Sequence, residues 1–126
     1  MGSSNPGSSP QVQLLNYHQL ESYAVIGVED YLRLLGEVIE DIPNQMAEIR
    51  DSVEQGNAPL VKARAHGLRG LVAYFGCAAM AARLAQLENQ EGIAPAQASA
   101  IHAELQVIWE QSLAALDSWR QSMTDL

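Results

Sequence analysis

The chain has 126 residues, of which 48% are hydrophobic, and a formal net charge of −8. This length fits one domain around one core. The acidic balance argues against nucleic acid as a partner, because phosphate contacts need clustered Lys and Arg. The single cysteine, Cys77, excludes an intrachain disulfide and a multi-cysteine metal site, and it favours a reducing cytoplasm.

Residues 1–13 are expected to be a tag or leader outside the fold. The first ten, MGSSNPGSSP, are mostly Gly, Ser and Pro and offer nothing to pack, and they lack the positive start and apolar run of a signal peptide. No later stretch approaches the roughly 20 apolar residues that span a bilayer. We therefore expect one cytoplasmic domain over residues 14–126, without direct membrane contact.

Apolar periodicity predicts a short helix over residues 17–23 and then a long amphipathic helix over residues 28–53. Apolar residues recur there at steps of three and four, namely Leu32, Leu35, Ile39, Ile42, Met46, Ile49 and Val53. Pro43 interrupts the backbone ladder, and we expect a bend there. A break into two helices is the alternative, but the apolar stripe continues in phase.

Three further long helices are predicted. Gly56 ends the preceding helix and Asn57 caps the next one, which covers residues 58–75 and ends near Gly76. The others cover residues 77–90 and 95–122, with Gly92 between them. Short loops make consecutive helices antiparallel neighbours. The predicted fold is all-α: an antiparallel up-down-up-down four-helix bundle with a short additional N-terminal helix.

His66 lies opposite the apolar stripe of the predicted helix over residues 58–75, at about 100° per residue. It therefore points to water. Its neighbours on the helix surface are Lys62, Arg69, Gly70 and Ala73. Two cations favour an anion near the ring, and two small residues leave room for a large partner.

This environment suits phosphoryl transfer. An exposed imidazole is mostly neutral at pH 7 and its nitrogen is a nucleophile, while positioning and charge stabilisation do most of the catalytic work in such reactions. A solvated, inert histidine is the alternative. Arg64 falls within the apolar stripe and must reach the edge of the bundle or find a carboxylate.

The stretch AHGLRGLVAYFGCAAMAARLAQLE, residues 65–88, resembles the signature of histidine-containing phosphotransfer (Hpt) domains of bacterial phosphorelays. The matching positions are His66, Leu68, Arg69, Gly70, Gly76, Leu87 and Glu88. Upstream, residues 31–57 resemble the preceding helix of that family, with its mid-helix proline and closing Gly-Asn. The resemblance spans about residues 14–122, and it departs from the pattern where Arg69 replaces the commoner Lys.

The resemblance implies that His66 takes a phosphoryl group from a receiver-domain aspartyl phosphate and passes it to another receiver aspartate. Lys62 and Arg69 would screen the charge, and Gly70 would give the receiver room. The partners would be response-regulator receiver domains, with a hybrid sensor histidine kinase. No cofactor is expected, since Mg²⁺ would belong to the receiver, and the chain would be a monomeric phosphohistidine carrier without kinase activity of its own.

Other readings stay open at this point. His18 and His102 have no metal-binding companions at helical spacing, so no metal site is expected. The chain could be a helical adaptor or dimerisation bundle that binds a partner without phosphotransfer. Two settings fit the resemblance: a free-standing protein, and the C-terminal domain of a hybrid sensor kinase, where this domain would be the cytoplasmic portion of a membrane-anchored protein.

A second apolar row predicts where a receiver docks. Tyr31, Leu34 and Val38 flank the core stripe at the same three-and-four spacing. One helix cannot bury both rows in a simple bundle, and uncovered apolar patches often mark binding sites. We therefore expect these three residues, with Ala73, to form a docking surface beside His66.

Overall fold

A computed structural model describes residues 13–124, and in this range the chain is all-helical, with no strand. The elements are α1 (Tyr17–Val38), α2 (Asp41–Glu54), α3 (Ala58–Tyr74), α4 (Ala78–Asn89), the 3-10 turn η1 (Pro95–Gln97) and α5 (Ala98–Thr124). The predicted fold class is confirmed. The leader predicted for residues 1–13 lies, except for Gln13, outside the described residues.

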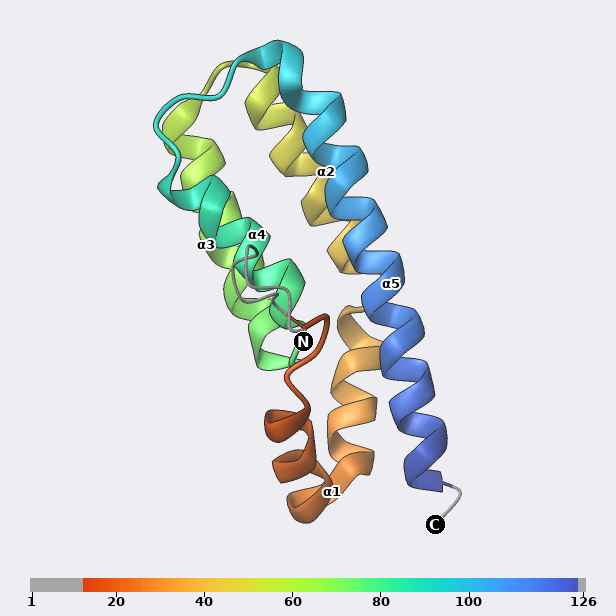
Figure 1. Ribbon diagram of the computed structural model, residues 1–126. Helices are drawn as coiled ribbons and strands as arrows, with labels where there is room; N and C mark the ends of the chain where they lie inside the picture. The colour runs from red at the N-terminus through yellow and green to blue at the C-terminus, as the bar shows by residue number, and fades with distance from the viewer. Residues whose placement is uncertain (1–12, 125–126) are drawn as a thin grey trace, which may run out of the picture.

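The bundle of four consists of α2, α3, α4 and the first half of α5 (Figure 1). Contacts join α2 to α3, α3 to α4, α4 to α5, and α5 back to α2, which closes the ring of helices. α5 has 27 residues, so it extends about 40 Å. Its second half runs beyond the bundle, alongside α1 (Figure 1).

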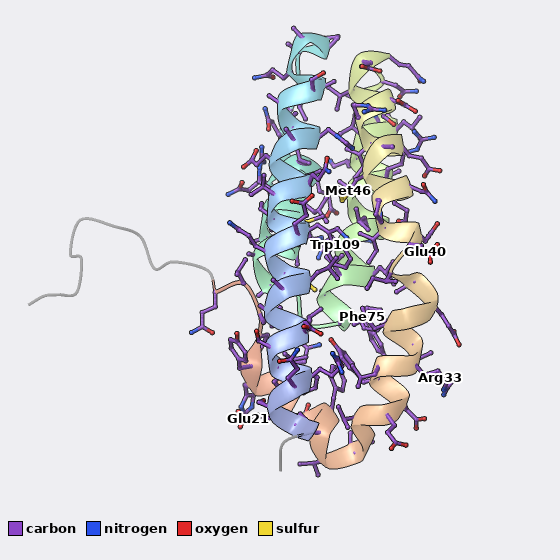
Figure 2. The ribbon with its side chains drawn as sticks, turned by 90° about the vertical axis from the view of Figure 1, so that its right-hand side faces the viewer. Glu21, Arg33, Glu40, Met46, Phe75 and Trp109 are labelled. Carbon is purple, nitrogen blue, oxygen red and sulfur yellow. The ribbon has the colours of Figure 1, made fainter. Side chains whose placement is uncertain are left out.

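Ile39 and Glu40 separate α1 from α2, where we predicted one bent helix. Both residues keep right-handed helical angles, with φ and ψ of −61° and −31° for Ile39, and −84° and −22° for Glu40, so α2 continues the course of α1 (Figure 2). Pro43 is the cause, because it has no N–H for the Ile39 carbonyl and its ring crowds that carbonyl. The expected bend within one helix is therefore wrong, because the structure has the alternative, a break into two helices. The break lies three to four residues before Pro43.

Gly27 divides α1 into two limbs, residues 17–26 and 28–38. Its φ of 158° and ψ of 96° are not helical, and the chain turns back there at the lower end of Figure 1. The first limb corresponds to the predicted short helix and is longer than predicted. The second limb is the start of the predicted long helix.

The core runs along the axis of the bundle. Figure 2 shows Met46 and Trp109 between α2 and α5, with Phe75 nearer the lower end, and all three are buried. The predicted cap of α3 is confirmed, since the Asn57 side chain accepts a 3.2 Å hydrogen bond from the backbone N–H of Leu60. No helix in residues 13–124 is long and apolar enough to cross a membrane.

Three side chains of α1 bind the C-terminal end of α3. The side-chain amide of Gln19 donates to the Tyr74 carbonyl at 3.0 Å, the Tyr23 hydroxyl donates to the same carbonyl, and the Tyr31 hydroxyl donates to the Phe75 carbonyl at 2.7 Å. The last carbonyls of a helix have no partner within it. These bonds satisfy them and hold both limbs of α1 against α3.

Candidate functional site

His66 stands on the solvent side of α3. The opposite side of the helix is buried and carries Val61, Ala65, Leu68 and Val72. The His66 side chain is 66% exposed, as the helical spacing predicts.

Glu88, on α4, is hydrogen-bonded to one nitrogen of the His66 ring. The His66 Nδ1 lies 2.7 Å from Glu88 Oε2, and the carboxylate is only 17% exposed. Hydrogen bonds from Arg69 and then from His66 lower the pKa of Glu88, so its carboxyl group is ionised and can only accept. An ionised carboxylate at this distance needs an N–H opposite it, so we assign the proton to Nδ1, the tautomer that leaves the Nε2 lone pair free.

Arg69 completes this cluster from one turn further along α3. Its Nε donates to Glu88 Oε1 at 2.7 Å, so the carboxylate accepts from two residues at once. A terminal nitrogen of the guanidinium lies 3.0 Å from His66 Nδ1. With the proton on Nδ1, both of these nitrogens are donors, so Arg69 and His66 share the Glu88 carboxylate rather than bonding to each other. The charge of Arg69 is largely balanced by Glu88.

Lys62 and Gly70 share the exposed side of α3 with His66, one turn away in either direction. Lys62 forms no ion pair within residues 13–124, so its charge is available to an incoming anion. A Cβ placed on Gly70 would meet no atom within 4 Å, and the same holds for Gly67. The surface next to the imidazole is therefore low and open.

Arg64 does not belong to this cluster. It turns toward α2, where its guanidinium donates to the Glu48 carbonyl and to the Ser52 hydroxyl, both at 2.7 Å. From the sequence we expected the Arg64 side chain to reach the edge of the bundle or to pair with a carboxylate. Instead, a backbone carbonyl and a hydroxyl accept its hydrogen bonds.

The four residues predicted for docking are not equally accessible. Tyr31 is 4% exposed and belongs to the core, since its ring packs edge-on against Phe75 with centroids 5.5 Å apart. The expectation of Tyr31 as a surface residue is therefore wrong, because the first limb of α1 and the second half of α5 cover it from two sides. Leu34, Val38 and Ala73 are half-buried and keep some surface for a partner.

Two other groups weighed from the sequence offer no site. Burial raises the pKa of the Cys77 thiol to about 12, which makes it inert at neutral pH. Within residues 13–124, no three His, Cys, Asp or Glu side chains gather where they could hold a metal ion.

The contact between Glu88 and His66 was not predicted from the sequence. The resemblance marked it as part of a Leu-Glu pair, but nothing in the local pattern connects it with His66, which lies 22 residues earlier. Only the pairing of α3 with α4 brings the two together. The Leu-Glu pair was therefore the one available signal.

The sequence profile of the Hpt domain family matches residues 33–119, which is well over half of the chain and includes both His66 and Glu88. Comparison with curated proteins gave no significant match, and comparison with solved structures gave none.

Proposed function

We propose that this chain acts in phosphotransfer. It belongs to the Hpt domain family, which transfers phosphoryl groups between the proteins of phosphorelays. In this proposal, His66 accepts a phosphoryl group from an aspartyl phosphate on a receiver domain and passes it to an aspartate on another receiver domain. The chain is then an intermediate carrier. It uses no nucleotide, and any Mg²⁺ belongs to the receiver.

One observation carries the proposal: the bond between His66 Nδ1 and Glu88, on a ring that is 66% exposed. It supports Nε2 as the attacking atom. The Nε2 lone pair forms a bond to phosphorus while the bond between phosphorus and the aspartate oxygen breaks, and the carboxylate leaves with the electron pair. Nδ1 keeps its proton, and the ring becomes a phosphorylated imidazolium that Glu88 stabilises. In the second transfer, an incoming carboxylate reverses these steps.

The neighbours of His66 take supporting roles. Lys62 attracts the phosphoryl oxygens, because its ammonium group has no carboxylate partner among the described residues. Arg69 orients the Glu88 carboxylate, which in turn orients the ring. Gly70 lets the loops around the receiver aspartate approach α3, and the half-buried side chains of Leu34, Val38 and Ala73 give the receiver an apolar contact.

The wider setting follows from the family. Hpt domains interact with receiver domains, so we propose response-regulator receivers as the direct partners, one of them carried by a hybrid sensor histidine kinase. We also propose a monomer that works in the cytoplasm, either alone or as one domain of such a kinase.

The test is direct transfer of label. A receiver domain carrying ³²P on its aspartate is mixed with the chain, and the chain is then assayed for acid-labile, base-stable phosphate. His66→Gln is expected to accept no label and to keep its helical circular dichroism, because the side chain is exposed. The matched controls are His18→Gln and His102→Gln, which change the other two histidines and should transfer normally.

Label on His66→Gln equal to that on the natural chain would exclude His66 as the acceptor. Binding to receivers without any label on the natural chain would favour the alternative, a helical adaptor.

A further inference from the structure

A small hollow opens between α1 and the end of α3. Its lining residues include Tyr23, Ile26, Asp30, Leu34 and Tyr74, the buried Tyr31 also contacts it, and its volume is about 170 Å³. An apolar cavity of about 150 Å³ holds one benzene molecule. The hollow is therefore large enough for one aromatic or branched aliphatic side chain.

The wall of this hollow includes apolar surface that no part of the described chain covers. Ile26 is 84% exposed, and Tyr74 is also exposed. Val25, which precedes Ile26 at the turn of α1, is 86% exposed but does not line the hollow. Contiguous exposed apolar surface is typical of protein interaction sites.

Two exposed residues of α3 relate the hollow to His66, since Tyr74 lines the hollow and lies on the same helix. Tyr74 follows His66 by eight residues, which is about 12 Å along α3. The open positions Gly67 and Gly70 lie between them. A protein interface of standard size covers about 800 Å² on each partner, a patch ~28 Å across. A receiver domain docked at His66 is therefore large enough to contact the hollow as well.

The two ends of this surface present opposite charges. Lys62, near His66, has no ion-pair partner among the described residues, whereas Asp30 lines the hollow with its side chain 82% exposed, and the exposed Glu29 precedes it. The salt bridge of Asp30 to Arg33 is 3.3 Å long and lies in solvent, so it is weak. A partner that matches both ends brings its acidic phosphoryl site to His66 and a cation to Asp30.

We propose that the hollow takes one large apolar side chain of the receiver domain, next to a Lys or Arg that pairs with Asp30. This inference rests on the proposed phosphotransfer function and names the feature by which the chain selects among receivers. The apolar side chain supplies affinity, and Asp30 penalises receivers that carry an acidic residue at that position.

The experiment uses the purified receiver domains of the source organism, each phosphorylated with acetyl phosphate, to find the receiver that transfers fastest to the natural chain. Transfer is then measured against receiver concentration for Ile26→Ser and Asp30→Lys. Their matched controls are Val25→Ser and Glu29→Lys, which make the same kinds of change one residue away and outside the hollow.

Both hollow variants are expected to raise the half-saturating receiver concentration about tenfold, with the maximal rate unchanged, while the controls stay within about twofold. Changing the matching Lys or Arg of the receiver to Glu should restore transfer to Asp30→Lys. Hollow variants that behave like their controls would overturn this inference while leaving phosphotransfer intact. Failure of every receiver to label His66 of the natural chain would overturn the proposed function and this inference with it.

Discussion

The hydroxyl of Tyr31 donates a 2.7 Å hydrogen bond to the carbonyl of Phe75 and so joins α1 to the end of α3. Tyr31 is 4% exposed, and water cannot easily replace the hydroxyl. Tyr31→Phe is expected to lower the free energy of unfolding by about 1–2 kcal/mol, because the carbonyl loses its partner in a buried place. Urea unfolding measures this. Tyr17→Phe, at an exposed position, is the control, and equal losses for both variants would show that the bond contributes nothing.

Removal of the Glu88 carboxylate should change the tautomer of His66. In the natural chain Glu88 holds the proton on Nδ1, and Glu88→Ala frees the ring to carry it on Nε2, the proposed attacking atom. We expect phosphoryl acceptance to slow about tenfold. Long-range ¹⁵N NMR of the imidazole reads the tautomer independently of the rate. A natural chain with the proton mainly on Nε2 would contradict this account.

The pH dependence of stability has a definite sign at Glu88. Hydrogen bonds from Arg69 and His66 hold its folded pKa below the unfolded value of about 4.3. The unfolded state therefore binds more protons, and the stabilisation is complete above the unfolded pKa and is lost as the pH falls through the folded one. In urea unfolding, the natural chain should have a higher free energy of unfolding than Glu88→Gln at pH 7, and this difference should decline below about pH 4. A difference that does not change with pH would count against it.

The charge beside His66 should affect the rate of transfer rather than the folding of α3. Lys62→Ala is expected to slow acceptance about 3- to 10-fold at low salt, and high salt should reduce the difference, because Lys62 acts on the approaching anion. Arg64→Ala makes a useful contrast, since Arg64 binds α2 and its loss should lower stability while transfer continues. Equal transfer by Lys62→Ala and the natural chain at low salt would remove Lys62 from the site.

Leu34 tests the apolar part of the proposed docking surface. Leu34→Asp is expected to weaken receiver binding at least about tenfold while the helical content is kept, because Leu34 is half-buried and lines the hollow. Leu32→Asp is the matched control, as Leu32 is also half-buried but lines a groove between α1 and α5. Isothermal titration with a receiver measures both. Equal weakening by the two variants would indicate damage to α1 rather than loss of a contact.

Local chemistry made α3 predictable. Its cap at Asn57, the end of the helix near Gly76 and the exposure of His66 all depend on nearest neighbours and on a period of 3.6 residues. The burial of Tyr31 was not predictable, because it depends on how α1 folds back at Gly27 and on where α5 ends. The bond between Glu88 and His66 depends on the register between α3 and α4, which no spacing within one helix specifies.

The bonds from Gln19, Tyr23 and Tyr31 to the end of α3 span 44 to 55 residues of sequence. During synthesis α1 emerges from the ribosome before α3, and therefore well before the carbonyls that it binds. Its first limb can settle only after α3 has formed, and closing such a long loop is slow compared with forming one helix. The hollow, which needs both α1 and Tyr74, is therefore expected to be among the last parts of the molecule to form, so a nascent chain cannot select a receiver before it has folded.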